Sequence, residues 1–208
     1  FLFGGGFVMA RRIQRVSIKR AGALQSLARS RAFKRAAKKM ASKKFERAKK
    51  NLINRFDSHP VTKEIEGGES ASNVSGTLSY GNLFTFIGFH QEDNPVEVIR
   101  TAIREKTRLL SPRTRVQTNR ILVNYTVTVP TVEELAGITP MPWEGKSWIK
   151  AIESGISGFG YYMYKRWESS RSGHGLQIDR KIRGGRYKPI KYYSELIRNF
   201  KKEIVSRK

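Results

Sequence analysis

The chain has 208 residues, of which 38% are hydrophobic, and a formal net charge of +24. This length is enough for one domain with a sizeable core, and no apolar run approaches the roughly 18 residues that a transmembrane helix needs, which argues against an integral membrane protein. Because the chain contains no cysteine, disulfides, zinc–thiolate sites and thiol nucleophiles are excluded. This absence fits a reducing compartment or a virus particle and selects neither.

Positive charge is concentrated at the two ends. Residues 1–45 contain 13 Lys and Arg and no acid, and residues 161–208 contain 14 bases and 4 acids. Residues 57–160 are nearly neutral, with 10 bases and 12 acids. This distribution is typical of a folded body with cationic appendages, which repel one another unless an anionic partner receives them. Solubility alone is the alternative, but a block of +13 exceeds what a small domain needs.

The first predicted elements are a basic arm and a long helix. Residues 11–31 have only a loose apolar pattern, and we expect them to become helical on docking. From Phe33 the apolar residues have helical spacing on one face: Phe33, Ala37, Met40, Ala41, Phe45, Ala48, Leu52 and Phe56. The other face carries lysines: Lys34, Lys38, Lys39, Lys43, Lys49 and Lys50. The helix should end at residues 57–60, because a residue before proline disfavours helical geometry. We therefore divide the chain into an arm, residues 1–32, and one α+β domain, residues 33–208.

The middle of the chain predicts a hairpin, a helix and a strand. Strands are expected at Thr77–Tyr80 and Leu83–Phe89, joined by a tight turn at Gly81–Asn82, with Leu83–Phe89 in the core. Asn94 followed by Pro95 predicts a helix start. Its buried stripe is expected to comprise Val96, Ile99, Ile103 and Leu110. Residues 120–129 alternate, with Ile121, Val123, Tyr125, Val127 and Val129 facing the core and Asn124, Thr126 and Thr128 facing water or a partner.

The last third predicts short elements and a closing helix. A short helix should follow Pro130, a loop should span Pro140 and Pro142, and residues 147–153 should form a helix with Trp148, Ile149 and Ile152 inward. We expect a strand at Phe159–Trp167. A final amphipathic helix should begin at Pro189 and bury Ile190, Tyr193, Ile197, Phe200 and Ile204. Together these elements predict an α+β fold, in which a long basic N-terminal helix and a C-terminal amphipathic helix pack on a curved, mainly antiparallel sheet.

No pattern in the chain predicts catalysis. The three histidines, His59, His90 and His174, lack the spacing of metal ligands. Neither a phosphate-binding loop nor a nucleophile elbow occurs. The carboxylates Glu64, Glu66 and Glu69 are interpreted as solvated loop charge. The sequence therefore predicts no catalytic residue, no metal and no cofactor, and we expect a protein that is not an enzyme.

The basic ends predict contact with a polyanion or a protein partner. Cations without neighbouring acids bind phosphates by counterion release, in a salt-sensitive and sequence-independent way. Aromatic residues are absent from residues 8–32, so base stacking is not expected there. An acidic face of a neighbouring protein is the alternative receptor. The candidate contact residues are Arg11, Arg12, Arg15, Lys19, Arg20, Arg29, Arg31, Lys34, Arg35, Lys38, Lys39, Arg180, Lys181, Arg183 and Arg186.

The order of several segments carries a family resemblance. A basic helix leads into His59-Pro60-Val61-Thr62, followed by Ser75-Gly76-Thr77-Leu78 and Gly81-Asn82-Leu83-Phe84; later Tyr161–Glu168 precedes a glycine-rich loop, and Pro189 opens the last helix. This order resembles the neck or tail-completion proteins of tailed bacteriophages, the head-to-tail connectors. The cationic arm before residue 33 is a departure from the compact members.

The resemblance implies a structural role in the virion. It implies a homo-oligomeric ring at the head-to-tail junction, assembled in the host cytoplasm, with portal, adaptor or tail proteins as neighbours, DNA as a further candidate partner and no membrane. A ribosomal or mitochondrial-ribosomal RNA-binding protein is the alternative, since it would also have basic ends without cysteine. An enzyme acting on nucleic acid is disfavoured, because no cluster of acidic metal ligands is evident.

Overall fold

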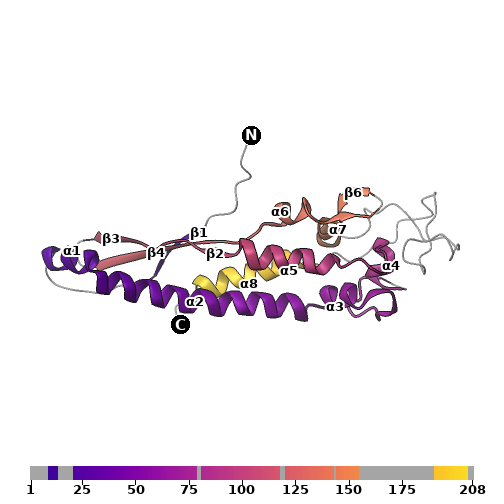
Figure 1. The fold of residues 1–208 in the computed structure, drawn as a ribbon, viewed down its shortest axis with the longest axis horizontal. Coiled ribbons are helices and arrows are strands. Elements are labelled where there is room, and N and C mark those ends of the chain that lie inside the picture. Colours follow the sequence, from indigo (N-terminus) through magenta and orange to yellow (C-terminus); the bar gives the residue numbers. More distant parts are fainter. Residues whose placement is uncertain are drawn as a thin grey trace.

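A long helix forms the spine of an elongated molecule (Figure 1). The structure is a computed structural model and describes residues 9–13, 21–78, 81–117, 120–142, 144–154 and 190–205. Helix α2 contacts α1, α3, α5 and α8. A small antiparallel sheet lies along the N-terminal part of α2, and α3 and α4 lie at the opposite end of the molecule. The expected α+β class is confirmed.

The helices vary widely in length. They are α1 (Ala21–Arg29), α2 (Arg31–Ser58), α3 (Pro60–Glu66), the 3-10 turn η1 (Gly68–Ser70), α4 (Leu83–Ile87), α5 (Pro95–Lys106), α6 (Val132–Ala136), α7 (Trp148–Ser154) and α8 (Tyr193–Val205). Ser30 caps α2 by accepting a hydrogen bond from the Phe33 amide. Because Pro60 disfavours helical geometry at its predecessor, α2 ends at Ser58, as predicted.

Strand β4 is the centre of the larger sheet. The strands are β1 (Met9–Ile13), β2 (Arg108–Leu109), β3 (Arg113–Gln117), β4 (Arg120–Thr128), β5 (Pro140–Met141) and β6 (Glu144–Ser147). One edge of β4 pairs with β1, and the other pairs with β2 and β3, all antiparallel. Strands β5 and β6 form a separate antiparallel pair.

The main core lies between α2, α5, α7 and α8. Trp148, Tyr192 and Phe56 are among its largest fully buried side chains. Two smaller clusters lie between the sheet and the N-terminal helices. In one of them the small residues Ala37 and Ala41 pack against Tyr125, whose hydroxyl donates to the Ala37 carbonyl at 3.3 Å. Small side chains on α2 therefore allow β4 to approach the helix closely.

Most predicted helices and the alternating strand are confirmed. The α5 cap at Asn94, the short helices α6 and α7, and the closing helix α8 are present, although α8 begins at Tyr193 rather than at Pro189. All five inward residues of the alternating run are buried: Ile121, Val123, Tyr125, Val127 and Val129. The strand predicted at Phe159–Trp167 lies outside the described residues.

The predicted hairpin around Gly81–Asn82 is wrong. Residues 83–87 form α4, and Thr77 and Leu78 are not in a strand. The Asn82 side chain caps α4 by accepting from the Thr85 amide at 2.9 Å. Gly88 ends the helix at φ 82°, a conformation that glycine adopts without strain. The expectation that this stretch is buried is nevertheless confirmed for Leu83, Phe84, Ile87 and Phe89.

Smaller corrections concern single residues and the arm. Met40 is 53% exposed, because it lies at the margin of the apolar side of α2. Leu110 is 44% exposed, because it follows the end of α5. The loop expected at Pro140 and Pro142 contains the β5–β6 pair. The expectation that residues 11–31 become helical only on docking is wrong for two parts of the arm. Residues 11–13 belong to strand β1, and α1 is formed in the single chain, where Leu24 and Ala28 pack against Ile121.

Candidate polyanion interface

The exposed side of α2 carries a row of cations, which we call the α2 stripe: Arg31, Lys34, Arg35, Lys38, Lys39, Lys43, Arg47 and Lys50. All eight side chains are exposed. Arg35, Lys39, Lys43, Arg47 and Lys50 lie opposite the buried side of the helix, and Lys34 and Lys38 lie beside Ala41 and Phe45 at its margin. Glu46 is the one acid between residues 31 and 50. Among the described residues, no carboxylate forms an ion pair with any member of the stripe.

The spacing of the stripe costs local stability. Arg31, Arg35, Lys39, Lys43 and Arg47 follow one another at i,i+4, so each side chain lies beside a like charge. Each such pair destabilises a helix by about 0.2–0.5 kcal/mol, which amounts to about 1–2 kcal/mol for the four pairs. An anion bound along the row would remove this repulsion. The arrangement is therefore suited to a polyanion rather than to an isolated, solvated helix.

Cations nearer the end of α2 have structural partners instead. The Lys49 ammonium donates to the carbonyl of Arg104 at 2.6 Å and to that of Thr107 at 2.9 Å, and so caps the C-terminus of α5. Arg55 forms an ion pair with Glu203 of α8 at 2.6 Å. Of the predicted lysine face, Lys34, Lys38, Lys39, Lys43 and Lys50 are thus exposed members of the stripe, and Lys49 holds a neighbouring helix.

The described residues contain six of the fifteen candidate contact residues with their side chains. Arg29, Arg31, Lys34, Arg35, Lys38 and Lys39 are all exposed, on α1 and α2. Arg11 and Arg12 are placed by their backbone only, in β1. Seven lie outside the described residues: Arg15, Lys19, Arg20, Arg180, Lys181, Arg183 and Arg186. The structure therefore brings together the α1 and α2 members of the set.

Sequence reasoning missed a second group of exposed cations, Arg113 and Arg115 on β3. A signal was present, because residues 107–132 contain four arginines and no acid. Residues 57–160 as a whole are nearly neutral, so the excess of arginine within residues 107–132 did not stand out.

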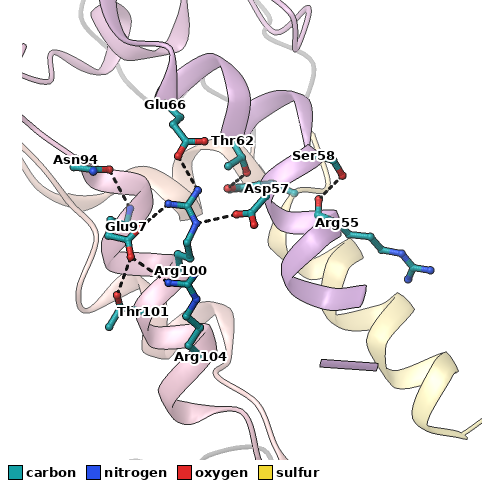
Figure 2. A network of polar contacts seen from close by, with 11 residues as sticks. Arg55, Asp57, Ser58, Thr62, Glu66, Asn94, Glu97, Arg100, Thr101 and Arg104 are labelled. Atoms are coloured by element: carbon teal, nitrogen blue, oxygen red, sulfur yellow. Dashed lines mark hydrogen bonds and ion pairs between the residues drawn. The ribbon is translucent and has the colours of Figure 1, made fainter. Parts of the chain in front are cut away.

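The densest group of charged side chains surrounds Arg100, at the junction of α2, α3 and α5 (Figure 2). Its guanidinium bonds Asp57 at 2.9 Å, Glu66 at 2.7 Å and Glu97 at 2.5 Å. Burial opposes its charge, but hydrogen bonds to Glu66, Glu97 and Asp57 outweigh that effect and raise the pKa of Arg100. The hydrogen bond from Arg100 lowers the pKa of Glu97. The three carboxylates are thus occupied by one internal cation, and the cluster joins helices.

A second polar junction links α3 to α8. His59 Nδ1 accepts from the Val61 amide at 3.2 Å, and its ring lies 4.7 Å from that of Tyr192. The Tyr192 hydroxyl lies 2.7 Å from the Thr62 hydroxyl. Burial lowers the pKa of His59, although the charge of Glu195 opposes this shift, and burial raises the pKa of Tyr192.

Glu64 is not the solvated charge that its sequence context predicts. Its side chain is fully buried and accepts from the Ser75 amide at 2.8 Å and the Leu83 amide at 2.7 Å. Glu64 therefore ties the loop after η1 to the N-terminus of α4. Within the part of the chain that the structure describes, no three His, Asp or Glu side chains are placed to hold a metal ion.

Comparisons with known proteins add no relative, because no family model, curated protein or solved structure matches the chain. Across the described ranges, no helix is both long enough and apolar enough to span a membrane.

Proposed function

We propose that this chain is a structural virion protein of a tailed phage, which assembles into a ring at the head-to-tail junction and receives an anionic partner along the α2 stripe. The observation that carries the proposal is the stripe itself, eight exposed cations along a helix whose apolar side chains are buried. Such a surface suits packaged DNA or the acidic face of an adjoining virion protein. In this role the chain has no catalytic step.

Three of the segments behind the family resemblance meet in space, which supports the proposal. The stretch His59–Thr62 forms the corner between α2 and α3. Two residues later, Glu64 binds the amides of Ser75 and Leu83, which belong to the other two segments. These three stretches therefore form one structural unit, whereas Tyr161–Glu168 and Pro189 lie outside the described residues.

The elongated shape suits a ring subunit (Figure 1). Repeated contacts between different surfaces of identical subunits close into a ring when the rotation between neighbours allows it. The two outer edges of the larger sheet, β1 on one side and β2 and β3 on the other, have no further strand among the described residues. Such edges offer backbone groups to a neighbouring copy.

Mass measurement and electron microscopy of the purified full chain test the proposal. We expect light scattering to give a mass several times the 23.8 kDa of one chain and negative-stain images to show rings. A monomer at every concentration and salt, copurifying with RNA, would refute the ring and favour the ribosomal alternative. Nuclease treatment before the measurement separates true self-association from bridging by nucleic acid.

A further inference from the structure

A second cationic surface lies on the outer face of the sheet, which we call the β3–β4 arginine face: Arg113, Arg115, Arg120 and Asn124. The antiparallel register pairs Arg113 with Asn124, Arg115 with Leu122 and Gln117 with Arg120. Paired residues point to the same side of a sheet, and neighbours along a strand alternate. The intervening residues Ile121, Val123 and Tyr125 pack toward α1 and α2. The arginines therefore lie on the side that faces away from those helices.

This face is positive, and the described part of the chain places no counter-charge on it. Arg113 and Arg115 are exposed, and neither side chain forms a hydrogen bond or an ion pair with any residue in the described ranges. Arg120 is half-buried, and its Nε donates to the Gln117 amide oxygen at 3.1 Å, which holds its guanidinium on the face. Residues 107–132 contain no Asp or Glu, so sequence neighbours supply no acid either.

The chemistry of the face selects among possible partners. A guanidinium binds phosphate with two parallel hydrogen bonds, and Asn and Thr side chains are common donors to phosphate and sugar. The aromatic residue of β4, Tyr125, packs on α2, so the described part of the face offers no ring for stacking the bases of a single strand. Leu122, the apolar residue of β4 on this face, is buried, whereas the centre of a protein interface is typically apolar and depleted of charge.

We propose that the β3–β4 arginine face is a second nucleic-acid-binding surface, which holds the phosphate backbone of a DNA duplex without reading its sequence. It lies on the opposite side of the sheet from α2, so it is separate from the α2 stripe. The proposal does not depend on ring formation. A chain with both surfaces can contact DNA on one side and a second anionic partner on the other.

Salt-dependent binding of a fluorescent duplex of about 30 base pairs to the full chain tests the proposal. The test variant is Arg113→Gln/Arg115→Gln, and the matched control is Lys63→Gln/Lys202→Gln, which removes the same charge from exposed positions on α3 and α8. If both arginines neutralise phosphates, the slope of log K against log salt decreases in magnitude by about 1.8. If the two proteins bind equally at about 1 M salt, this change in slope lowers the affinity at 0.1 M salt by about 60-fold. The control should retain the wild-type slope.

A conservative variant guards against misfolding. Arg113→Lys/Arg115→Lys retains the charge and loses the planar fork, so we expect the wild-type salt slope with a lower affinity. Equal slopes for the Gln variant and its control would overturn the proposal, and so would a Gln variant that loses binding to poly-glutamate but not to the duplex. Rings seen by microscopy alongside either result would leave the proposed function standing, so the two can fail separately.

Discussion

Replacing Arg100 by methionine should destabilise the whole fold, because this side chain joins three helices. Its side chain is 12% exposed, while its partners Asp57, Glu66 and Glu97 are 40%, 45% and 43% exposed. Methionine keeps most of the buried stem and removes the charge. Three carboxylates would then face one another, with only the exposed Arg104 still in contact with Glu97.

The size of the effect follows from the geometry. A hydrogen bond to a charged group contributes about 1.5–3 kcal/mol, and loss of one partner of a buried pair costs about 3–5 kcal/mol. Because water can reach the released carboxylates, we discount these figures. We expect Arg100→Met to lower the free energy of unfolding by about 2–4 kcal/mol, a decrease in Tm of roughly 10 °C for a chain of this size.

Urea unfolding followed by the fluorescence of buried Trp148, which is 1% exposed, measures the change. The matched control is Arg104→Met, because Arg104 is 54% exposed and contacts Glu97 at 3.6 Å; we expect less than about 0.5 kcal/mol. Since Arg100 lowers the pKa of Glu97, the stabilisation that the Arg100–Glu97 pair gives the fold is present at neutral pH. It is lost as pH falls through that lowered pKa. The difference between variant and wild type should therefore shrink in acid. Equal effects of the two arginines, or a pH-independent difference, would refute this account.

Three further predictions concern caps and charges. Because burial lowers the pKa of His59, its contribution to stability is complete above the unfolded value of about 6.5 and is lost as pH falls below it. The urea midpoint of wild type should decrease between about pH 7.5 and about pH 5.5, and His59→Asn, which can still cap α3, should reduce that decrease. Asn82→Ala should lower the free energy of unfolding by about 3 kcal/mol, because Asn82 caps α4 and donates to the carbonyls of Glu69 and Ala71. Asn94→Ala removes an exposed cap and should lower it by about 1 kcal/mol. Thermal unfolding measures both changes. Lys39→Glu should raise the free energy of unfolding by about 1 kcal/mol at low salt, because it replaces two repulsive i,i+4 pairs with attractive ones. The same change should weaken duplex binding. A gain in stability that persists at about 1 M salt would contradict an electrostatic origin.

Local patterns predicted the elements whose signals lie within a few residues. The spacing of Ala37, Ala41, Phe45 and Ala48 defined the buried side of α2, and the cap at Asn94 marked the start of α5. The run Leu83–Phe89 has no clear period, so sequence could assign its burial but not its conformation. Its helix depends on Asn82 and on the buried Glu64, which binds the Leu83 amide from 19 residues away in the chain.

By itself, the sequence determined that α2 has one apolar and one cationic side, because helical geometry relates residues three or four apart wherever the helix lies. Tertiary structure alone decided which of its cations remain available: Lys49 reaches the end of α5 and Arg55 reaches α8, whereas the stripe has no such partner in the described ranges. Tertiary structure also decided that Arg113 and Arg115 share a face with Asn124. The antiparallel register is set by how two separate strands pair and pack against a core.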